Sequence, residues 1–406
     1  MNRHIQQVAV LGSGVMGSRI ACHFANIGCQ VLLLDIVTPG LQEQDANNPA
    51  ARNKMVNGAL QAAVKQNPSP VYSKKVLSNI TTGNFDDDLG KIQSADWIIE
   101  VVIEQLDIKR SLMEKVESFR RPGTLITSNT SGIPIHEIAA GRSEDFRRHF
   151  CGTHFFNPPR YLRLLEIIPT PDTDSSVTDF LMDYGDRFLG KQTVLCKDTP
   201  AFIANRIGVF SIMSVLKVME ELEMNIDEVD ALTGPVSGRP KSATFRTTDV
   251  VGLDTMVKVA SNTYAACTTD EARDIFKIPD YVQQMMDRKW LGDKTGQGFF
   301  KKEKDAAGNR TILSLNLQTM EYQPQTKPQF ATIGAARQVD DLKERLKVLH
   351  AGKDKAGDFY RAITYRVNQY VSNRIPEIAD ELYRIDDAMR AGFGWELGPF
   401  EAWDAL

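Results

Sequence analysis

The sequence predicts an α/β domain built on a parallel sheet, followed by an all-α region. Two observations carry this prediction. In residues 1–199, short apolar runs alternate with segments of helical periodicity, which is the pattern of strands joined by crossover helices. After Thr199-Pro200 the strand pattern largely stops, and residues 202–223 form one long segment of helical periodicity.

The elements of the first domain follow from its apolar runs and from the residues that interrupt them. Val8-Ala9-Val10-Leu11 stops at Gly12, which is typical of a short buried strand, and the next segment repeats with a helical period. A second apolar run ends at Asp35 and completes a strand–helix–strand unit. The same reasoning predicts strands at 8–11, 31–34, 80–82, 97–101, 125–127, 151–155, 162–168 and 193–196, with helices at 16–27, 47–65, 108–119 and 177–188.

A weak internal repeat suggests how the rest of the chain is organised. Ile226-Asp227-Glu228 resembles Ile385-Asp386-Asp387, and each is followed by a segment rich in glycine and proline. We predict a first domain over 1–199, a helical domain over 200–300, a connecting region of modest regular structure over 301–355, and a partial second helical copy over 356–406. The second copy is expected to pack against residues 200–300. Chance similarity between helical segments is the alternative.

Composition excludes several classes of protein. The 406 residues hold 48 Lys and Arg against 52 Asp and Glu, so the chain lacks the basic excess of a nucleic-acid binder. No apolar stretch is long enough to cross a membrane, and no signal sequence opens the chain. The five cysteines are scattered and never spaced as ligand pairs, so we expect no metal site, no disulfide framework and a cytoplasmic protein.

A glycine-rich turn between the first strand and the first helix predicts a dinucleotide site in a Rossmann-like domain. Its three glycines allow a tight turn, a close approach of a diphosphate to the backbone, and close packing of helix on strand. Asp35 can accept hydrogen bonds from ribose hydroxyls and would repel a 2′-phosphate, which favours NAD over NADP. Packing alone is the alternative role for the glycines. The residues expected to contact the cofactor here are Gly12, Ser13, Gly14, Val15, Met16, Gly17 and Asp35.

Proton-transfer chemistry is predicted near the ends of later strands. His154 lies in Thr153-His154-Phe155, and an imidazole is suited to proton transfer near neutral pH. Glu166 interrupts an apolar strand, which is costly unless the carboxylate is paired, and a neighbouring His154 would provide that partner. A structural histidine and an outward-facing Glu166 remain open. Asn129, Ser131 and Asn205 offer polar groups that could face a cleft, or could serve as turn and cap residues.

Together these motifs resemble the L-3-hydroxyacyl-CoA dehydrogenase family of fatty-acid β-oxidation. The similarity covers residues 8 to about 300, in order and with similar spacing. Gly132 and Phe300 depart from the family's common Ser and Tyr, and neither change removes a reactive group. The similar segments are Gly12-x-Gly14-x-Met16-Gly17, Ser128-Asn129-Thr130-Ser131, His154-Phe155-Phe156-Asn157-Pro158, Glu166, Phe202-x-x-Asn205-Arg206 and Gly292-Asp293-Lys294-Thr295-Gly296-Gln297-Gly298-Phe299-Phe300.

The resemblance implies roles for individual residues. His154 and Glu166 match the family's catalytic dyad, while Ser131 and Asn205 match residues that contact the substrate's reacting oxygen and thioester region. Lys54 matches a lysine that meets the CoA phosphates. The further NAD contacts implied are Glu104, Lys109, Asn129 and Lys294.

The implied activity is oxidation of an L-3-hydroxyacyl-CoA to a 3-ketoacyl-CoA with NAD. Two rivals stay open: a non-catalytic NAD-binding relative, and a two-domain dehydrogenase of free β-hydroxy acids, which usually uses a lysine base where this chain has Asn205-Arg206. Long multifunctional relatives imply a fused or associated enoyl-CoA hydratase domain. The acyl chain length, the choice between monomer and homodimer, and whether Leu406 is a natural end are not predicted.

Overall fold

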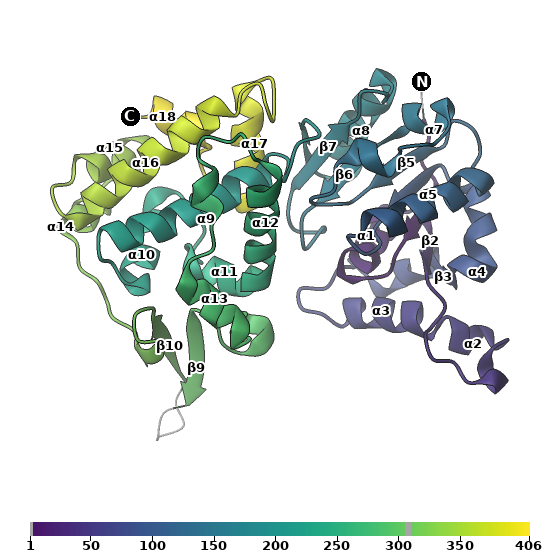
Figure 1. The fold of residues 1–406 in the computed structure, drawn as a ribbon, viewed down its shortest axis with the longest axis horizontal. Coiled ribbons are helices and arrows are strands. Elements are labelled where there is room, and N and C mark those ends of the chain that lie inside the picture. The colour runs from purple at the N-terminus through teal and green to yellow at the C-terminus, as the bar shows by residue number, and fades with distance from the viewer. Residues whose placement is uncertain (1–2, 305–309) are drawn as a thin grey trace. The chain divides into compact units, whose positions relative to one another are not determined.

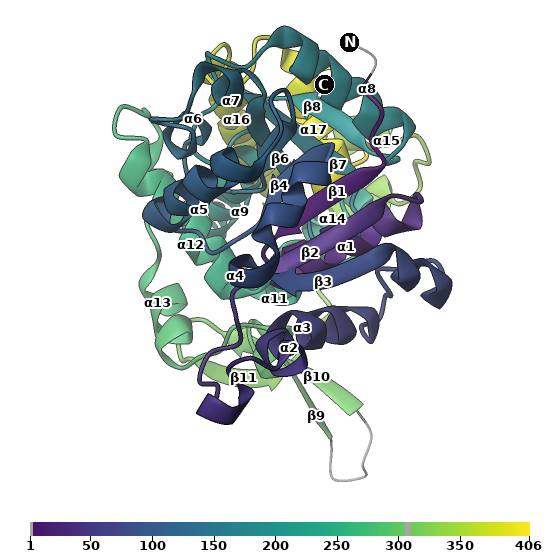
Figure 2. The same ribbon diagram turned by 90° about the vertical axis from the view of Figure 1, so that its right-hand side faces the viewer.

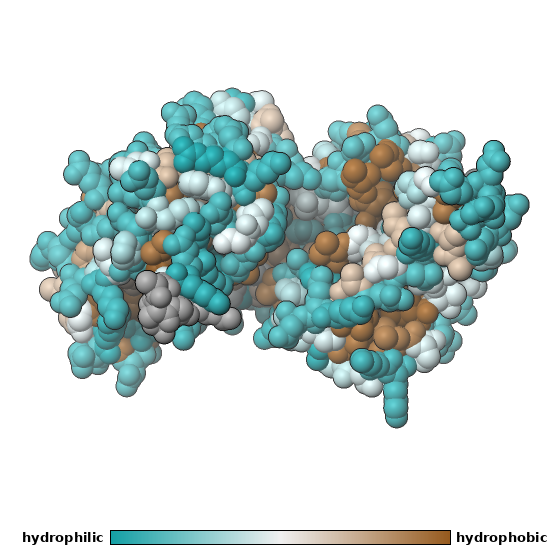
Figure 3. All heavy atoms as spheres, turned by 90° about the horizontal axis from the view of Figure 1, so that it is seen from below, coloured by the Kyte–Doolittle hydropathy of each residue, from teal (hydrophilic) through white to brown (hydrophobic). Residues whose placement is uncertain are grey.

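The computed structural model describes residues 3–304 and 310–406, which divide into two units, Met1–Phe202 and Ile203–Leu406 (Figure 1). The division falls at the start of the long helix that the sequence places after Pro200. Among the described residues, no helix combines the length and the apolar composition needed to cross a membrane. On the face that Figure 3 shows, hydrophilic residues cover most of the surface and hydrophobic ones gather in small areas.

The first unit is built on one sheet of eight strands in the order β3-β2-β1-β4-β5-β6-β7-β8 (Figure 2). The six strands from β3 to β6 run parallel, whereas β7 pairs antiparallel with β6, and β8 is parallel to β7. The predicted parallel sheet is confirmed from β3 to β6, and the strand direction reverses at β7, for which no direction was predicted from the sequence. The strands are β1 (Gln7–Leu11), β2 (Gln30–Asp35), β3 (Ile80–Asn84), β4 (Trp97–Glu100), β5 (Leu125–Ser128), β6 (Phe150–Phe155), β7 (Leu164–Pro169) and β8 (Gln192–Leu195).

The antiparallel pair has a simple cause in chain length. Only a short loop separates β6 from β7, and a parallel return would need a crossover of a dozen or more residues. The chain fills the sheet in one direction from β1 to β3 and in the other direction from β4 onward, so the strand order reverses between β1 and β4. In open α/β sheets such a reversal opens a crevice at the carboxyl ends of the strands, where ligands bind.

Helices cover this sheet, and most follow the predicted segments. The segment 47–65 differs, because Asn48 accepts a hydrogen bond from Ala50 N and starts a short helix that ends before Asn53. A second helix then begins at Lys54. The helices of this unit are α1 (Val15–Asn26), α2 (Pro49–Arg52), α3 (Lys54–Val64), α4 (Phe85–Asp88), α5 (Leu106–Phe119), α6 (Ile135–Ile138), α7 (Glu144–Arg148) and α8 (Ser175–Arg187).

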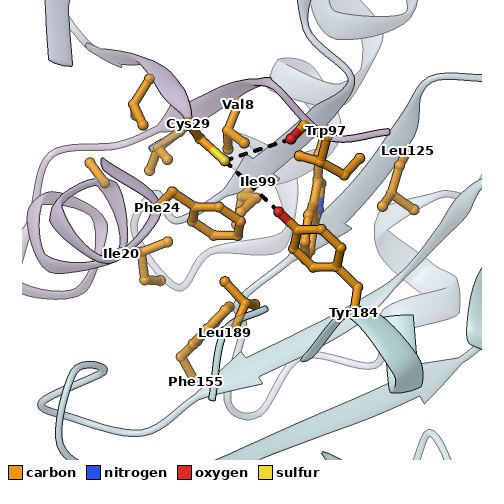
Figure 4. Packing of buried hydrophobic residues seen from close by; sticks show 14 of the residues in the cluster. Val8, Ile20, Phe24, Cys29, Trp97, Ile99, Leu125, Phe155, Tyr184 and Leu189 are labelled. Carbon is orange, nitrogen blue, oxygen red and sulfur yellow. Dashed lines mark hydrogen bonds between the residues drawn. The ribbon is translucent and has the colours of Figure 1, made fainter. Parts of the chain in front are cut away.

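A cluster of aromatic and aliphatic side chains joins α1 to the sheet (Figure 4). Phe24 of α1 meets Trp97 of β4 edge-on, with ring centroids 5.1 Å apart. The Cys29 thiol lies 3.8 Å from the Tyr184 hydroxyl, and burial raises the pKa of that thiol. All five cysteines are buried. This packing holds the carboxyl ends of β1 and β4 in fixed positions.

The second unit is mostly helical. Its helices are α9 (Ala204–Glu221), α10 (Ile226–Leu232), α11 (Phe245–Val251), α12 (Leu253–Ala266), α13 (Asp280–Asp287), α14 (Ala331–Ala336), α15 (Leu342–Ala351), α16 (Lys355–Asn373), α17 (Leu382–Phe393) and α18 (Pro399–Asp404). An antiparallel sheet of β9 (Phe300–Lys304), β10 (Arg310–Asn316) and β11 (Glu321–Pro324) interrupts them. The expectation of little regular structure over 301–355 was therefore wrong, since this segment holds most of that sheet, α14 and α15.

Residues 356–406 pack against the first helical copy, as the repeat led us to expect. Helices α16 and α17 both contact α9. The correspondence between the copies differs from the one the sequence suggested. Asp230 accepts from the backbone N–H of Phe245 at the start of α11, and Asp386 accepts in the same way from Phe400 at the start of α18. Asp230, rather than Asp227, is therefore the counterpart of Asp386.

Candidate active site

The glycine-rich turn has the backbone geometry that a dinucleotide site requires. Gly12 has φ +109°, and a Cβ there would lie 2.6 Å from the carbonyl oxygen of Val101. A Cβ at Gly17 would lie 1.8 Å from the carbonyl oxygen of Gly12, so helix and strand could not pack as they do. A Cβ at Gly14 meets nothing within 4 Å, so open space lies beside this glycine.

That open space lies at the N-terminus of α1, which carries no side-chain cap and no acidic residue in its first turn. Uncapped N–H groups and the positive end of a helix dipole form an anion site, and a diphosphate is the anion that this turn suits. Val15, the first residue of α1, is exposed. The loop therefore fits the diphosphate of NAD by the shape of its backbone.

Asp35 ends β2 beside the same turn. Its Oδ2 accepts from the Ser13 backbone N at 2.6 Å and from the Ser13 hydroxyl at 2.5 Å, while Oδ1 accepts from the Ile36 backbone N. Three of the carboxylate's roughly four acceptor positions are thus in use. A ribose that binds both oxygens must displace the Ser13 hydroxyl, so Ser13 and Asp35 act together in this site.

The predicted His–Glu pair forms across the antiparallel strands. His154 on β6 and Glu166 on β7 are register partners, and His154 Nδ1 lies 2.7 Å from Glu166 Oε2. Both side chains are buried, Glu166 completely. Phe156 and Phe202 pack against the imidazole with ring centroids at 4.5 and 5.6 Å. A carboxylate on Nδ1 fixes the ring and leaves Nε2 as the proton-accepting atom.

Ser131 lies in the loop after β5, and Glu104 holds this loop in place. Glu104 Oε1 accepts from the Thr130 hydroxyl at 2.6 Å and from the backbone N of Ser131 and of Gly132, each at 3.0 Å. The Ser131 hydroxyl makes no hydrogen bond to another residue that the structure describes. Asn129 ties the loop to β6, because its Oδ1 accepts from Phe155 N at 2.9 Å.

A buried ion pair between Lys109 and Glu100 lies next to Glu104 and helps to hold its carboxylate. Lys109 Nζ lies 2.7 Å from Glu100 Oε1 and 3.4 Å from Glu104 Oε2, and the side chains of Lys109 and Glu100 are almost wholly inaccessible. Burial raises the pKa of Glu100, although Lys109 and a 2.5 Å hydrogen bond from the Ser128 hydroxyl oppose that rise. Burial also disfavours ionised Glu104, but the Lys109 charge and the hydrogen bonds from the Ser131 loop outweigh it and lower its pKa.

Sequence reasoning did not single out Glu100. The signal that could have found it is the carboxylate at the end of Trp97-Ile98-Ile99, because an acid in such a run must have a buried partner. Lys109, in the first turn of α5, is that partner.

The remaining predicted residues belong to other elements of the two units. Lys54 begins α3 in the first unit and is exposed. Asn205 lies in the first turn of α9, in the second unit, next to Arg206, whose guanidinium pairs with Asp270 at 2.6 Å. Lys294, also in the second unit, is paired with Asp254. The contacts predicted for Lys54, Asn205 and Lys294 with ligands stay predictions.

Comparison with known proteins identifies the family. Residues 7–199 match the model of the 3-hydroxyacyl-CoA dehydrogenase NAD-binding domain, and residues 202–302 match that of the 3-hydroxyacyl-CoA dehydrogenase C-terminal domain. The chain belongs to the 3-hydroxyacyl-CoA dehydrogenase family. Its N-terminal domain is accordingly an NAD-binding domain, in agreement with the geometry of the glycine turn.

Individual relatives extend the match over the whole chain. A probable 3-hydroxyacyl-CoA dehydrogenase of Bacillus subtilis is 47% identical over 100% of this chain and 52% of its own length. A putative fatty acid oxidation complex trifunctional enzyme of Rickettsia felis is 32% identical over 99% of this chain and 53% of its own. The chain thus spans about half the length of these curated relatives.

A solved structure supports the fold over nearly the full chain. The 3-hydroxybutyryl-CoA dehydrogenase of Escherichia coli K12 aligns with 99% of this chain and 91% of its own, with a TM-score of 0.68 and 24% sequence identity. At that identity the comparison concerns the fold alone. It covers the helices of residues 356–406, which lie outside both family models.

Proposed function

We propose that this chain oxidises an L-3-hydroxyacyl-CoA to the 3-ketoacyl-CoA with NAD as hydride acceptor. The observation that carries the proposal is the buried pair His154–Glu166, 2.7 Å apart, in an NAD-binding domain of this family. A base oriented by a second group is the arrangement that proton abstraction from an alcohol needs. Family membership supplies the substrate class.

In this mechanism His154 Nε2 takes the proton of the 3-hydroxyl group. Glu166, fully buried, stabilises the imidazolium that forms and keeps the ring from turning. The chemistry that NAD supplies is acceptance of the hydride from C3. The phenyl rings of Phe156 and Phe202 exclude water from one side of the imidazole, which strengthens the electrostatic interaction between His154 and Glu166.

Ser131 is proposed to donate its hydroxyl to the reacting oxygen. Its position depends on Glu104, which accepts from the backbone of the same loop, and Glu104 depends on Lys109. Donors fixed before the reaction stabilise developing charge without reorganising. We propose that Asn205 contributes a second donor near the thioester, and that Lys54 and Lys294 contact the CoA phosphates and NAD, respectively.

The whole protein's partners are part of the proposal. A relative named as a putative trifunctional enzyme aligns with 99% of this chain, but the aligned part is only 53% of that relative's length. We propose that this chain works with a fused or associated enoyl-CoA hydratase domain. Because residues 356–406 already cover α9, a monomer is favoured over a homodimer for this chain. No disulfide joins two cysteines among the residues that the structure describes, which supports a reducing compartment such as the cytoplasm.

The test is an absorbance assay of NADH consumption with acetoacetyl-CoA and, separately, with free acetoacetate. Saturable turnover of the CoA ester, with at least a hundredfold lower kcat/KM for the free acid, supports the proposal. Equal or better turnover of the free acid favours a β-hydroxy acid dehydrogenase. Binding of NAD without turnover of any 3-ketoacyl-CoA favours a non-catalytic relative.

A further inference from the structure

A cavity inside the second unit has a lining that the proposed reaction does not use. It has a volume of about 130 Å³ and lies between α9, α16, the segment that follows α10, and the segment from the end of α17 through α18. Both copies of the helical repeat therefore contribute to its wall. At roughly 10–15 Å³ for each small group, the cavity has room for about ten non-hydrogen atoms.

Three polar side chains in the wall have no hydrogen-bond or ion-pair partner among the described residues: Ser211, Arg239 and Asn368. Ser211 and Asn368 are only 6% and 7% exposed, and both line the cavity. The other polar groups in the wall differ: His350 contacts the Leu346 carbonyl and the Thr364 hydroxyl.

Of these three residues, Arg239 is the one that carries a charge. Its guanidinium carbon lies 3.1 Å from the ring centroid of Trp395, which belongs to the second copy of the repeat. Stacking fixes the plane of the guanidinium but uses none of its N–H donors. Burial lowers the pKa of Arg239, and no carboxylate among the described residues lies within ion-pair distance of it. An anion that enters the cavity would meet a cation whose plane is held by Trp395.

The rest of the wall is mainly apolar. Its apolar residues include Ile212 and Val215 of α9, Val367 of α16, and Leu397. An apolar wall with a few polar groups is the usual composition of a small-molecule site. The combination selects a ligand with an aliphatic chain and one anionic end. A carboxylate suits the guanidinium because two oxygens match its paired N–H groups.

We propose that this cavity binds an aliphatic carboxylate of about eight carbons, with its carboxylate on Arg239 and its chain against α9 and α16. Two sources share this chemistry: a free carboxylic acid, and an acyl chain whose far end carries a carboxylate. The second source rests on the proposed function, because Asn205 lies one turn before Gly208 on α9, and Gly208 lines the cavity. The first source does not depend on that function.

Calorimetric titration of the whole chain with octanoate tests the site directly. We expect saturable binding of octanoate. Octanol, which lacks the negative charge, and acetate, which lacks the long aliphatic chain, should each bind at least tenfold more weakly. Arg239→Met should weaken the binding of octanoate at least tenfold. Arg288→Met is the matched control, because Arg288 also stacks on a tryptophan of this unit, Trp290, but does not line the cavity. The control should leave octanoate binding unchanged.

The source is decided by turnover of two substrates. If the ligand is the far end of a substrate, Arg239→Met should lower kcat/KM at least tenfold for a CoA ester ending in a carboxylate, and less than twofold for the plain ester of equal length. If it is a free acid, both esters should change equally while octanoate binding is lost. Should Arg239→Met fail to fold, the wild-type comparison of octanoate with octanol still decides the proposal. Absence of octanoate binding together with equal kcat/KM for both esters in wild type and variant would overturn it.

Discussion

Replacing Glu166 by Gln removes one charge from the centre of the proposed mechanism while keeping its shape. Glu166 Oε2 lies 2.7 Å from His154 Nδ1 and is fully buried. Between unit charges about 4 Å apart at an effective dielectric constant of about 20, the attraction is about 4 kcal/mol. The amide oxygen of Gln can still accept from Nδ1, and a neutral hydrogen bond recovers about 1 kcal/mol.

The net loss of about 3 kcal/mol falls on the imidazolium, which forms only as the hydroxyl proton is transferred. At about 1.4 kcal/mol for each factor of ten, kcat should fall by about two orders of magnitude. NAD affinity should not change, because the glycine turn and Asp35 lie between other strands of the sheet. The decisive quantities are kcat from NADH absorbance and the NAD dissociation constant from calorimetry.

A matched control is Glu117→Gln, since Glu117 pairs with Arg142 on the surface of the same unit. Its kcat should stay within twofold of wild type. If Glu166→Gln also stays within threefold, the carboxylate does not stabilise a charged His154, and the electrostatic reasoning fails.

The remaining predictions address the cofactor, the loop, stability and the repeat. Asp35→Ala should weaken NAD binding and reduce the preference for NAD over NADP, which steady-state kinetics with both cofactors would measure. If the wild type already used NADP as efficiently as NAD, the argument from Asp35 would be wrong. Glu104→Ala removes the acceptor for two backbone N–H groups of the Ser131 loop, so kcat should fall at least tenfold. Glu104→Gln keeps an acceptor oxygen and should retain more activity. Equal kcat values for the two variants would show that the loop does not need this acceptor. Burial lowers the pKa of His23 from 6.5 to about 4, so the folded protein resists protonation and its stability falls by up to about 3 kcal/mol as the pH drops from 6.5 to 4. In urea titrations at pH 7 and pH 5, His23→Asn should lose less stability on acidification than the wild type, and an identical loss would refute this. Deleting residues 350–406 should expose the face of α9 that α16 and α17 cover and cause self-association by light scattering; equal solubility and monomeric mass for both chains would argue against it.

The fold of the first unit was largely predictable because its signals are local. The glycine turn, the acid after β2 and the short apolar runs each depend on residues close in sequence, and all appear at the predicted positions. The reversal at β7 was not predictable from β propensity, because direction depends on the length of a connection rather than on the strand's own residues. The predicted helix over 47–65 is divided at Asn53, which is the C-cap of α2 and the N-cap of α3, and the helical period of the sequence conceals this division.

In the second unit the missed features depend on pairing between distant residues. The sheet β9–β10–β11 carries many charged side chains, and only its ladder of backbone hydrogen bonds shows that the segments are strands. The equivalence of Asp230 and Asp386 rests on which backbone N–H groups each carboxylate accepts from, whereas sequence similarity had matched Asp386 with Asp227, three residues before Asp230. In the site, the sequence predicted the pairing of His154 with Glu166, whereas the role of Glu100 could be recognised only from the folded structure, in which Lys109 pairs with it.

The central claim is that His154 is the base, and His154→Gln tests it most directly. Gln at this position has no group that can take a proton near neutral pH, and loss of a general base costs about 10²–10⁴-fold in rate. The measurement is kcat for acetoacetyl-CoA reduction with saturating NADH, alongside calorimetric binding of the cofactor to the same preparation. We predict that kcat falls by at least a hundredfold while cofactor affinity stays within twofold of wild type. A near-normal kcat in His154→Gln would contradict the account and remove His154 from the mechanism.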